Sequence, residues 1–94
     1  MLPPMAERIR SKLATLRPTR LVIEDESGQH VGHPGARPGG ESHFRLEIVS
    51  PAFAGESRVE RQRRVYALLA EELGSGMHAL RLKTLTPDED RKPG

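Results

Sequence analysis

Apolar side chains recur along this chain with two different spacings, one typical of helices and one typical of strands. With the first spacing, apolar residues follow every three or four positions from Met5 to Leu16, which places them on one stripe of a helix. Pro4 suits a helix start, where a missing N–H breaks no hydrogen bond. Pro18 disfavours a helical conformation at the residue before it. We therefore predict a first helix that ends at about Leu16 or Arg17.

Three later stretches alternate between apolar and polar positions, the spacing of a strand with one buried face. They cover residues 20–26, 43–49 and 78–85. In the third stretch Leu80 is in phase with His78. We therefore expect His78 to begin the last strand, with its side chain on the face that packs on the core.

A second helix is predicted between the second and third strands. Ser57 and Glu60 have the spacing of a capping box, in which each side chain bonds to the other residue's backbone N–H. Helical spacing continues to about Leu73, and the glycines that follow suit a helix end. The predicted buried stripe of this helix consists of Val59, Tyr66, Leu69 and Leu73, widened by Val65 and Leu68.

The order of these elements predicts an α+β fold with one three-stranded mixed sheet. A strand–helix–strand connection is almost always right-handed and joins parallel strands, so the last two strands should be parallel. The first two strands, joined by one loop, should be antiparallel, with both helices on one face of the sheet. A chain of 94 residues is typical of a single domain. We expect that domain to span residues 1–94, with its core over about 5–87 and a polar, frayed tail over 88–94.

The stretch SGQHVGHPGARPGG, residues 27–40, interrupts the pattern with five glycines and two prolines. It has no hydrophobic periodicity, so we predict a long, mobile connection between the first two strands. Connections of this length are uncommon inside compact domains and are often functional. This one carries His30 and His33.

The composition limits the classes of function. Fifteen basic against 13 acidic residues give a formal net charge of +2, which by itself does not require a nucleic-acid partner. The chain has no cysteine, which excludes disulfides, thiolate ligands and cysteine nucleophiles of its own. No apolar run is long enough for a membrane span, and the N-terminus has no signal-peptide pattern. We expect a cytoplasmic protein without a membrane partner.

Four histidines are the main candidate ligands in the sequence. For His78, the ordinary explanation of the pattern is a partly buried, hydrogen-bonded histidine at a strand end. Loop histidines such as His30 and His33 are more often incidental polar residues than ligands, and a position such as His43 at a strand start is more often structural or solvent-exposed. Histidines without neighbouring carboxylates do not form a closed zinc site. No nucleotide-binding or hydrolase motif occurs in the sequence, so we expect that the chain is not an enzyme.

Arginines recur along the first half of the predicted second helix. Arg58, Arg61 and Arg64 follow at intervals of three residues and could run along the phosphates of a nucleic acid. A solvated helix face is the more common origin of such a row. The predicted exposed strand positions carry no aromatic platforms for single-stranded bases.

Several short motifs follow one another in a definite order and spacing. They are ESHF at Glu41–Phe44, IVSPAFAGES at Ile48–Ser57, RVY at Arg64–Tyr66, LAEEL at Leu69–Leu73, MHAL at Met77–Leu80 and KTLTPDE at Lys83–Glu89. No one motif is specific, but together they resemble the BolA family, and the resemblance covers about residues 5–89, which is nearly the entire chain.

The resemblance implies a class II KH-like αββαβ fold and a partnership with a monothiol glutaredoxin in iron–sulfur handling. In this partnership, glutaredoxin and glutathione would supply thiolates to a shared [2Fe–2S] cluster, and this chain would supply imidazole. His78 matches the main histidine ligand of the family. His30 best matches the second ligand, with His33 as its competitor. The isolated chain is expected to be a monomer without a cofactor.

The resemblance also implies an alternative role, DNA-binding regulation of transcription in stress response and cell morphology. It would use Arg58, Arg61, Arg64 and Lys83. The chain departs from related patterns at two places. Its strand-to-helix connection SPAFAGES lacks the GxxG loop with which KH domains hold RNA. Gln62 stands where many members have a histidine between two arginines.

Overall fold

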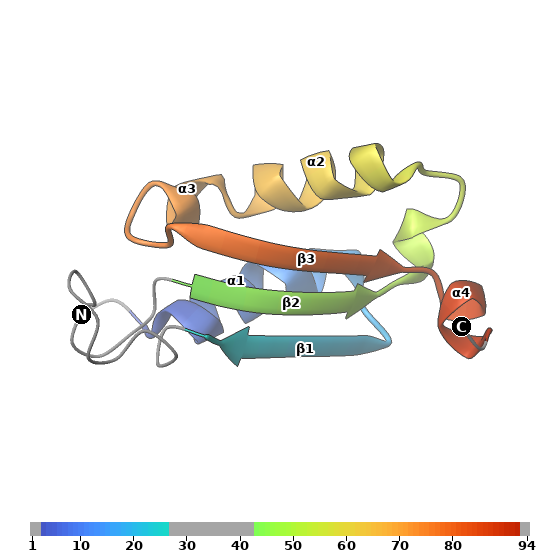
Figure 1. Cartoon of the computed structure of the whole chain (residues 1–94), viewed down its shortest axis with the longest axis horizontal. Helices are drawn as coiled ribbons and strands as arrows, with labels where there is room; N and C mark the ends of the chain where they lie inside the picture. The colour runs from blue at the N-terminus through green and yellow to red at the C-terminus, as the bar shows by residue number, and fades with distance from the viewer. Residues whose placement is uncertain (1–2, 27–42, 93–94) are drawn as a thin grey trace.

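The computed structural model describes residues 3–26 and 43–92, and Figure 1 shows their arrangement. The elements, in chain order, are helix α1 (Met5–Leu13), the 3₁₀ turn η1 (Ala14–Leu16), strands β1 (Arg20–Asp25) and β2 (His43–Val49), the 3₁₀ turn η3 (Pro51–Phe53), helices α2 (Arg58–Leu68) and α3 (Ala70–Leu73), strand β3 (Ala79–Leu85) and helix α4 (Pro87–Arg91).

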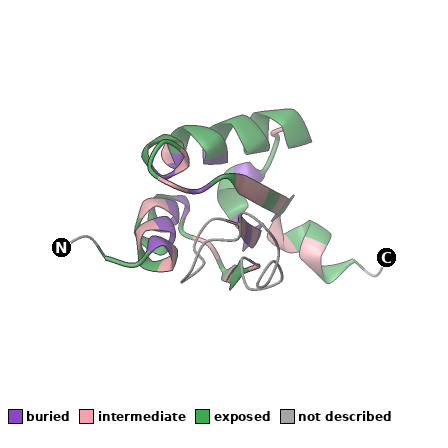
Figure 2. Cartoon of the chain, turned by 60° about the vertical axis from the view of Figure 1, so that its left-hand side comes forward, coloured by how far each residue is buried: buried purple, intermediate pink, exposed green. Residues whose placement is uncertain are grey.

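The three strands form one mixed sheet in the order β1-β2-β3. Strand β1 is antiparallel to β2, and β3 is parallel to β2, so Leu46 lies between Ile23 on one side and Leu82 on the other. Helices α1 and α2 cover one face of this sheet, and buried residues lie between the two layers (Figures 1 and 2). The predicted α+β fold, a three-stranded mixed sheet with the helices on one face, is confirmed.

The first helix agrees with its sequence pattern. Met5, Ile9, Leu13 and Leu16 are all buried and belong to one core cluster with residues of β2 and α2. Arg17 adopts a left-handed conformation, with a φ of 48°, directly after η1. The helical region therefore ends at Leu16, within the predicted bounds, and the residue before Pro18 is not right-handed helical.

The predicted buried stripe of the second helix is wrong in part. Val59 and Tyr66 are 54% and 41% exposed, whereas Arg61 and Val65 are buried. The helix is also broken at Leu69, which separates α2 from α3. The stripe that faces the sheet runs through residues 61, 65 and 69, and hydrophobicity alone assigns position 61 to solvent because it carries an arginine.

The turns around the second helix agree with prediction. Ser57 and Glu60 form both hydrogen bonds of the capping box, at 3.1 and 2.9 Å. Phe53, in η3, folds onto the core and is fully buried. Arg61 lies over its ring, 5.8 Å from the centroid, which provides a cation–π contact inside the core.

The prediction of a frayed tail over residues 88–94 is wrong for residues 88–91, because they belong to helix α4, and residues 93–94 lie outside the described residues. Thr86 and Glu89 make a second capping box, and the Glu89 carboxylate also pairs with Arg61 of α2. Helix α4 lies beyond the end of the sheet and covers neither face (Figure 1). No helix among the described residues is long and apolar enough to cross a membrane.

Candidate functional site

His78 lies at the end of the sheet where β2 and β3 begin. It directly precedes β3, whose first residue, Ala79, is opposite His43 at the first position of β2. The prediction that His78 belongs to the strand and packs toward the core is wrong. Its side chain is exposed, whereas Met77, just before it, is buried. The buried methionine anchors the chain and leaves the imidazole directed to solvent.

The long connection between β1 and β2 leaves and returns at this same end of the sheet. Glu26 donates its backbone N–H to the His43 carbonyl at 2.8 Å, so the two residues on either side of the undescribed stretch are bonded to each other. His30 and His33 lie outside the described residues. The structure thus places both attachment points of their segment at the same end of the sheet as His78, and the positions of His30 and His33 are untested.

The donors available around His78 make an incomplete metal site. No group of three or more His, Asp or Glu side chains that could hold a metal occurs in the part of the chain that the structure describes. No described residue hydrogen bonds to the His78 side chain, and the chain has no cysteine. One exposed imidazole fits an iron ligand when another chain completes the coordination, and a histidine pair in place of thiolates occurs in Rieske centres.

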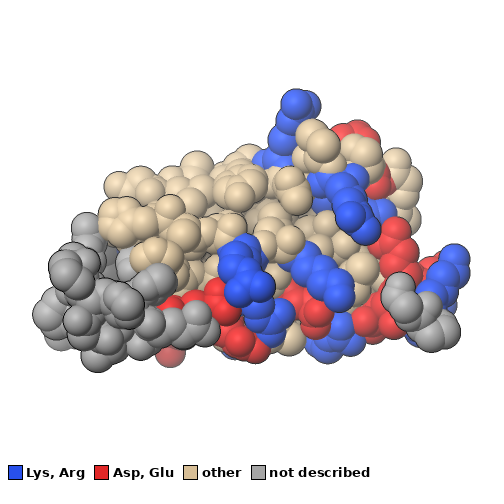
Figure 3. Space-filling model, in the orientation of Figure 1, with Lys and Arg blue, Asp and Glu red and all other residues tan. Residues whose placement is uncertain are grey.

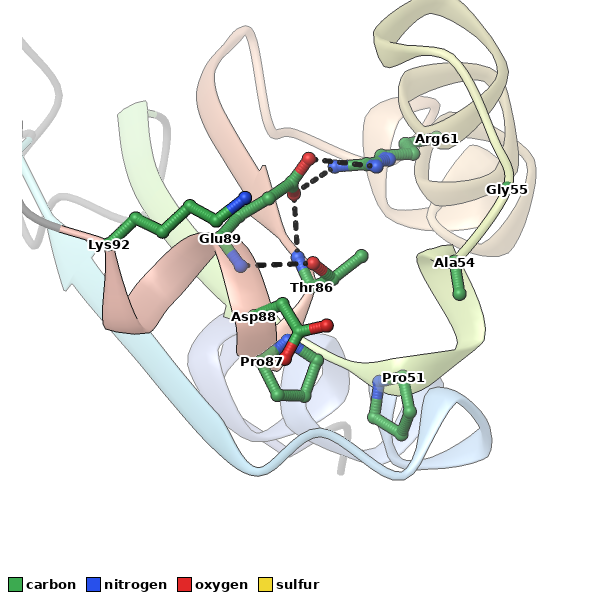
Figure 4. A pocket seen from close by; sticks show the side chains of 9 residues that line it. All are labelled: Pro51, Ala54, Gly55, Arg61, Thr86, Pro87, Asp88, Glu89 and Lys92. Carbon is green, nitrogen blue, oxygen red and sulfur yellow. Dashed lines mark hydrogen bonds and ion pairs between the residues drawn. The ribbon is translucent and has the colours of Figure 1, made fainter.

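At the opposite end of the sheet, Arg61 of α2 connects the start of its own helix, strand β3 and helix α4. Its side chain is 8% exposed and donates from Nε to the Glu56 carbonyl at 2.9 Å and from Nη1 to the Thr84 carbonyl of β3 at 3.3 Å. Two further bonds reach the Glu89 carboxylate, at 2.7 and 3.3 Å (Figure 4). The expectation that Arg61 lines an exposed row with Arg58 and Arg64 is therefore wrong.

Glu89 is adapted to this contact. Its bonds from Arg61, together with the backbone N–H of Thr86, lower the pKa of the Glu89 carboxyl from 4.5 to about 2. A hollow of about 500 Å³ opens beside the pair, between η3 and α4 (Figure 4). Because the guanidinium is already occupied by Glu89, the hollow offers no uncompensated arginine to an anionic ligand.

Sequence reasoning missed Glu89, although a signal was present. Thr86 and Glu89 have the same spacing as Ser57 and Glu60, the capping box that predicts the start of the second helix. The polar composition of residues 88–94 instead favoured the prediction of a frayed tail. Its pairing with Arg61, 28 residues away, has no sequence signal.

The other cations predicted to contact DNA differ in whether they form ion pairs with the described residues. Arg64 pairs with Glu56, and the Lys83 ammonium lies 3.8 Å from Glu47. Arg58 is exposed and makes no ion pair with the described residues. Arg58 and Lys83 meet at a smaller hollow of about 210 Å³ between α2 and β3, together with Gln62. The structure thus brings Arg58 and Lys83 together and removes Arg61 from the set.

Charge is unevenly distributed on the sheet face that no helix covers. Ion pairs connect neighbouring strands across it, such as Arg20 with Glu47 at 2.9 Å and Arg45 with Glu24. Figure 3 shows positively and negatively charged side chains side by side over the strands and toward α4 on this face, whereas neutral side chains predominate beside α3. Near the start of β3, Arg81 pairs with Glu26 at 3.0 Å.

Comparison with known proteins gives a consistent result. The family model described as BolA-like protein matches residues 13–89. The chain is 51% identical over 87 residues to protein BOLA1, chloroplastic, of Arabidopsis thaliana, covering 89% of this chain and 54% of that protein. It is 44% identical over 84 residues to the DNA-binding transcriptional regulator BolA of Escherichia coli, covering 88% of this chain and 76% of the relative.

A solved structure agrees with these relatives. The structure of BolA1 from Arabidopsis thaliana matches with a TM-score of 0.84 and 47% identity, over 99% of this chain and 100% of that one. The chain spans about half the length of the chloroplastic relative.

Proposed function

The chain belongs to the BolA-like protein family, and on that premise we propose that it partners a monothiol glutaredoxin and gives histidine ligation to a shared [2Fe–2S] cluster. The observation that carries the proposal is His78, an exposed imidazole without a described hydrogen-bond partner at the end of the sheet where β2 and β3 begin. The process served would be cluster assembly, cluster trafficking or iron regulation.

Each part of the chain has a defined role in this proposal. His78 is the first ligand and His30 the second, with His33 as competitor. The cluster, with thiolates from glutaredoxin and glutathione, supplies the redox chemistry, and imidazole in place of thiolate raises its potential. The buried Met77 and the pairing of Ala79 with β2 hold the backbone on both sides of His78. The proposal assigns no catalysis to this chain and no cofactor to it in isolation.

Mixing the chain with a monothiol glutaredoxin that already carries its cluster tests the proposal. We expect the visible absorption and circular dichroism to change, and His78→Ala to abolish the change because the ligand is removed. His43→Ala, at the neighbouring strand start, is the matched control and should retain it. Unchanged spectra on mixing the native chain would refute the partnership. A spectral change that survives in His78→Ala would instead show an adaptor whose histidine does not touch iron.

A second candidate function is DNA binding, since the Escherichia coli relative is named a DNA-binding transcriptional regulator. The structure favours Arg58 and Lys83 over Arg61 as phosphate contacts, because they flank one exposed hollow. Duplex affinity should fall steeply with salt as condensed counterions are released, and less steeply in the Arg58→Ala/Lys83→Ala double variant. Equal salt slopes for the native chain and the double variant would eliminate this site.

The cellular compartment is also part of the proposal. We place the protein in the cytoplasm, as a monomer until it meets glutaredoxin. The chloroplastic designation of the Arabidopsis relative belongs to that longer protein.

A further inference from the structure

The turn that leads into His78 is held to the first helix by one arginine. Arg8 of α1 donates from Nε to Oε2 of Glu72 at 3.2 Å and from Nη2 to Oγ of Ser75 at 3.0 Å. Glu72 belongs to α3, and Ser75 belongs to the turn between α3 and β3. A single guanidinium therefore connects α1 both to the helix before the turn and to the turn itself.

Glu72 is a charged side chain with no solvent exposure. Burying a carboxylate is costly unless cations and hydrogen bonds compensate it. Arg8 supplies both to Oε2, while the Lys12 ammonium lies 3.4 Å from Oε1. Oε1 has no hydrogen bond of good geometry within the described part of the chain, and Lys12 lies beside it without the two-sided contact that Arg8 makes. Arg8 is therefore the main restraint on where Glu72 can lie.

The backbone of Glu72 holds the same turn. Its carbonyl accepts hydrogen bonds from the N–H groups of Ser75, at 3.1 Å, and Met77, at 3.3 Å. Met77 is buried and is bonded directly to His78 along the chain. A continuous series of contacts therefore runs from α1 through Glu72 to the residue before the candidate ligand.

The turn itself has little intrinsic stiffness. Gly74 and Gly76 flank Ser75, and Gly76 adopts a φ of +129° that residues with a Cβ rarely adopt. Glycine has the widest backbone freedom of all residues, so two of them within three positions favour motion. The contact from Arg8 to Ser75 restrains the one residue of this turn that carries a side chain.

We propose that Arg8, through Glu72 and Ser75, is a positioning residue that restrains His78 for ligation. This inference rests on the function proposed for His78. A ligand that is already oriented loses less conformational freedom when it binds, which favours binding to a partner's metal group. Arg8 does not touch the ligand, so its effect must pass through the turn.

Amide ¹⁵N relaxation of the isolated chain tests the proposal without any cluster. We expect residues 74–78 of the native chain to have order parameters near the rigid value of about 0.85. Arg8→Gln should lower them toward the flexible range, below about 0.6, because both restraints are lost. Arg10→Gln is the matched control, since Arg10 is exposed on the same helix and makes no described ion pair.

Ser75→Ala keeps the test decisive if Arg8→Gln fails to fold. It removes the hydroxyl that accepts from Arg8 and that also donates, at 3.5 Å, to the Glu72 carbonyl. It leaves the Arg8–Glu72 pair intact, so it should loosen the turn without unfolding the protein, and Ser75→Thr should restore the order. Native order parameters at residues 74–78 in Ser75→Ala would overturn the inference. This outcome is separate from the failure of the proposed function, which appears as unchanged spectra when the native chain meets glutaredoxin.

Discussion

The two ends of the sheet both contain a mostly buried arginine paired with a glutamate, yet they serve different purposes. At one end, Arg61 binds Glu89 of the C-terminal helix and two backbone carbonyls, and it is 8% exposed. At the other end, Arg8 is 13% exposed and binds Glu72 and Ser75 beside the turn that presents His78. The Arg61–Glu89 pair attaches helix α4 to the end of the sheet, whereas the Arg8–Glu72 pair lies beside the turn that leads to the exposed His78.

The difference lies in what each arginine holds. The partners of Arg61 are backbone carbonyls and a carboxylate that is itself 43% exposed, so the contact attaches α4 and leaves no group for chemistry. The Arg8 contact instead buries its carboxylate completely and ends at a turn with two glycines. In this small sheet, one ion pair therefore attaches a terminal helix at one end, and another holds the turn before His78 at the other end.

The largest effect on stability is expected for Arg61→Leu. This substitution leaves the Glu56 and Thr84 carbonyls without their donor and removes the cation beside Glu89. Hydrogen bonds to a charged group each contribute about 1.5–3 kcal/mol, so the free energy of unfolding should fall by about 2–4 kcal/mol. Urea denaturation measures this loss.

Arg64→Leu is the control for Arg61→Leu. Arg64 is on the same helix and also pairs with a glutamate, Glu56, but its side chain is 45% exposed. Exposed ion pairs contribute little because water and salt screen them. If both variants lose the same free energy of unfolding, burial does not make the Arg61 contacts more stabilising than the exposed Arg64–Glu56 pair.

Hydrophobic patterning predicted the order of helices and strands. Both the Met5–Leu16 stripe and the period-two alternation depend on apolar side chains avoiding water. The structure buries the stripe and the apolar positions of β2, whereas the apolar side chains of β1 and β3 are half-buried against the core. Patterning failed at Arg61 and Glu72, because a charged residue is buried only when a partner distant in sequence compensates it. Lys12 and Arg8 precede Glu72 by about 60 residues, and no local pattern announces that contact.

The candidate site was predictable to a lesser degree. Family resemblance predicts a ligand role for His78, and this role stays a prediction, whereas the pattern of Leu80 and Leu82 predicted that the imidazole faces the core. The structure exposes it, because the chain bends at Gly76 and anchors itself through Met77 before β3 begins. The second ligand, His30 or His33, stays a prediction.

A smaller effect is expected from the Glu89 carboxylate alone, because Arg61 keeps its two carbonyl acceptors when Glu89 is neutral. The pKa of Glu89 is lowered from 4.5 to about 2 in the folded protein, so its contribution is complete above pH 4.5 and is lost as pH falls toward 2. Glu24 and Glu60 also have lowered pKa values and add to acid destabilisation. Urea midpoints should therefore decrease with falling pH in both proteins, but less steeply in Glu89→Gln. Equal slopes would contradict the role of this pair.

The smallest effect is expected for Lys12→Met, which tests whether the His78 end depends on Arg8 more than on Lys12. The Lys12 side chain is 38% exposed and lies 3.3 Å from Glu71 and 3.4 Å from Glu72, without the two-sided contact of Arg8. We expect a loss below about 1 kcal/mol that shrinks in high salt, since partly exposed pairs are screened. The comparison is urea unfolding at low and high sodium chloride, with Arg10→Met as the control on the same helix. A salt-independent loss as large as that of Arg61→Leu would show instead that Glu72 Oε1, which has no hydrogen bond within the described part of the chain, relies mainly on Lys12.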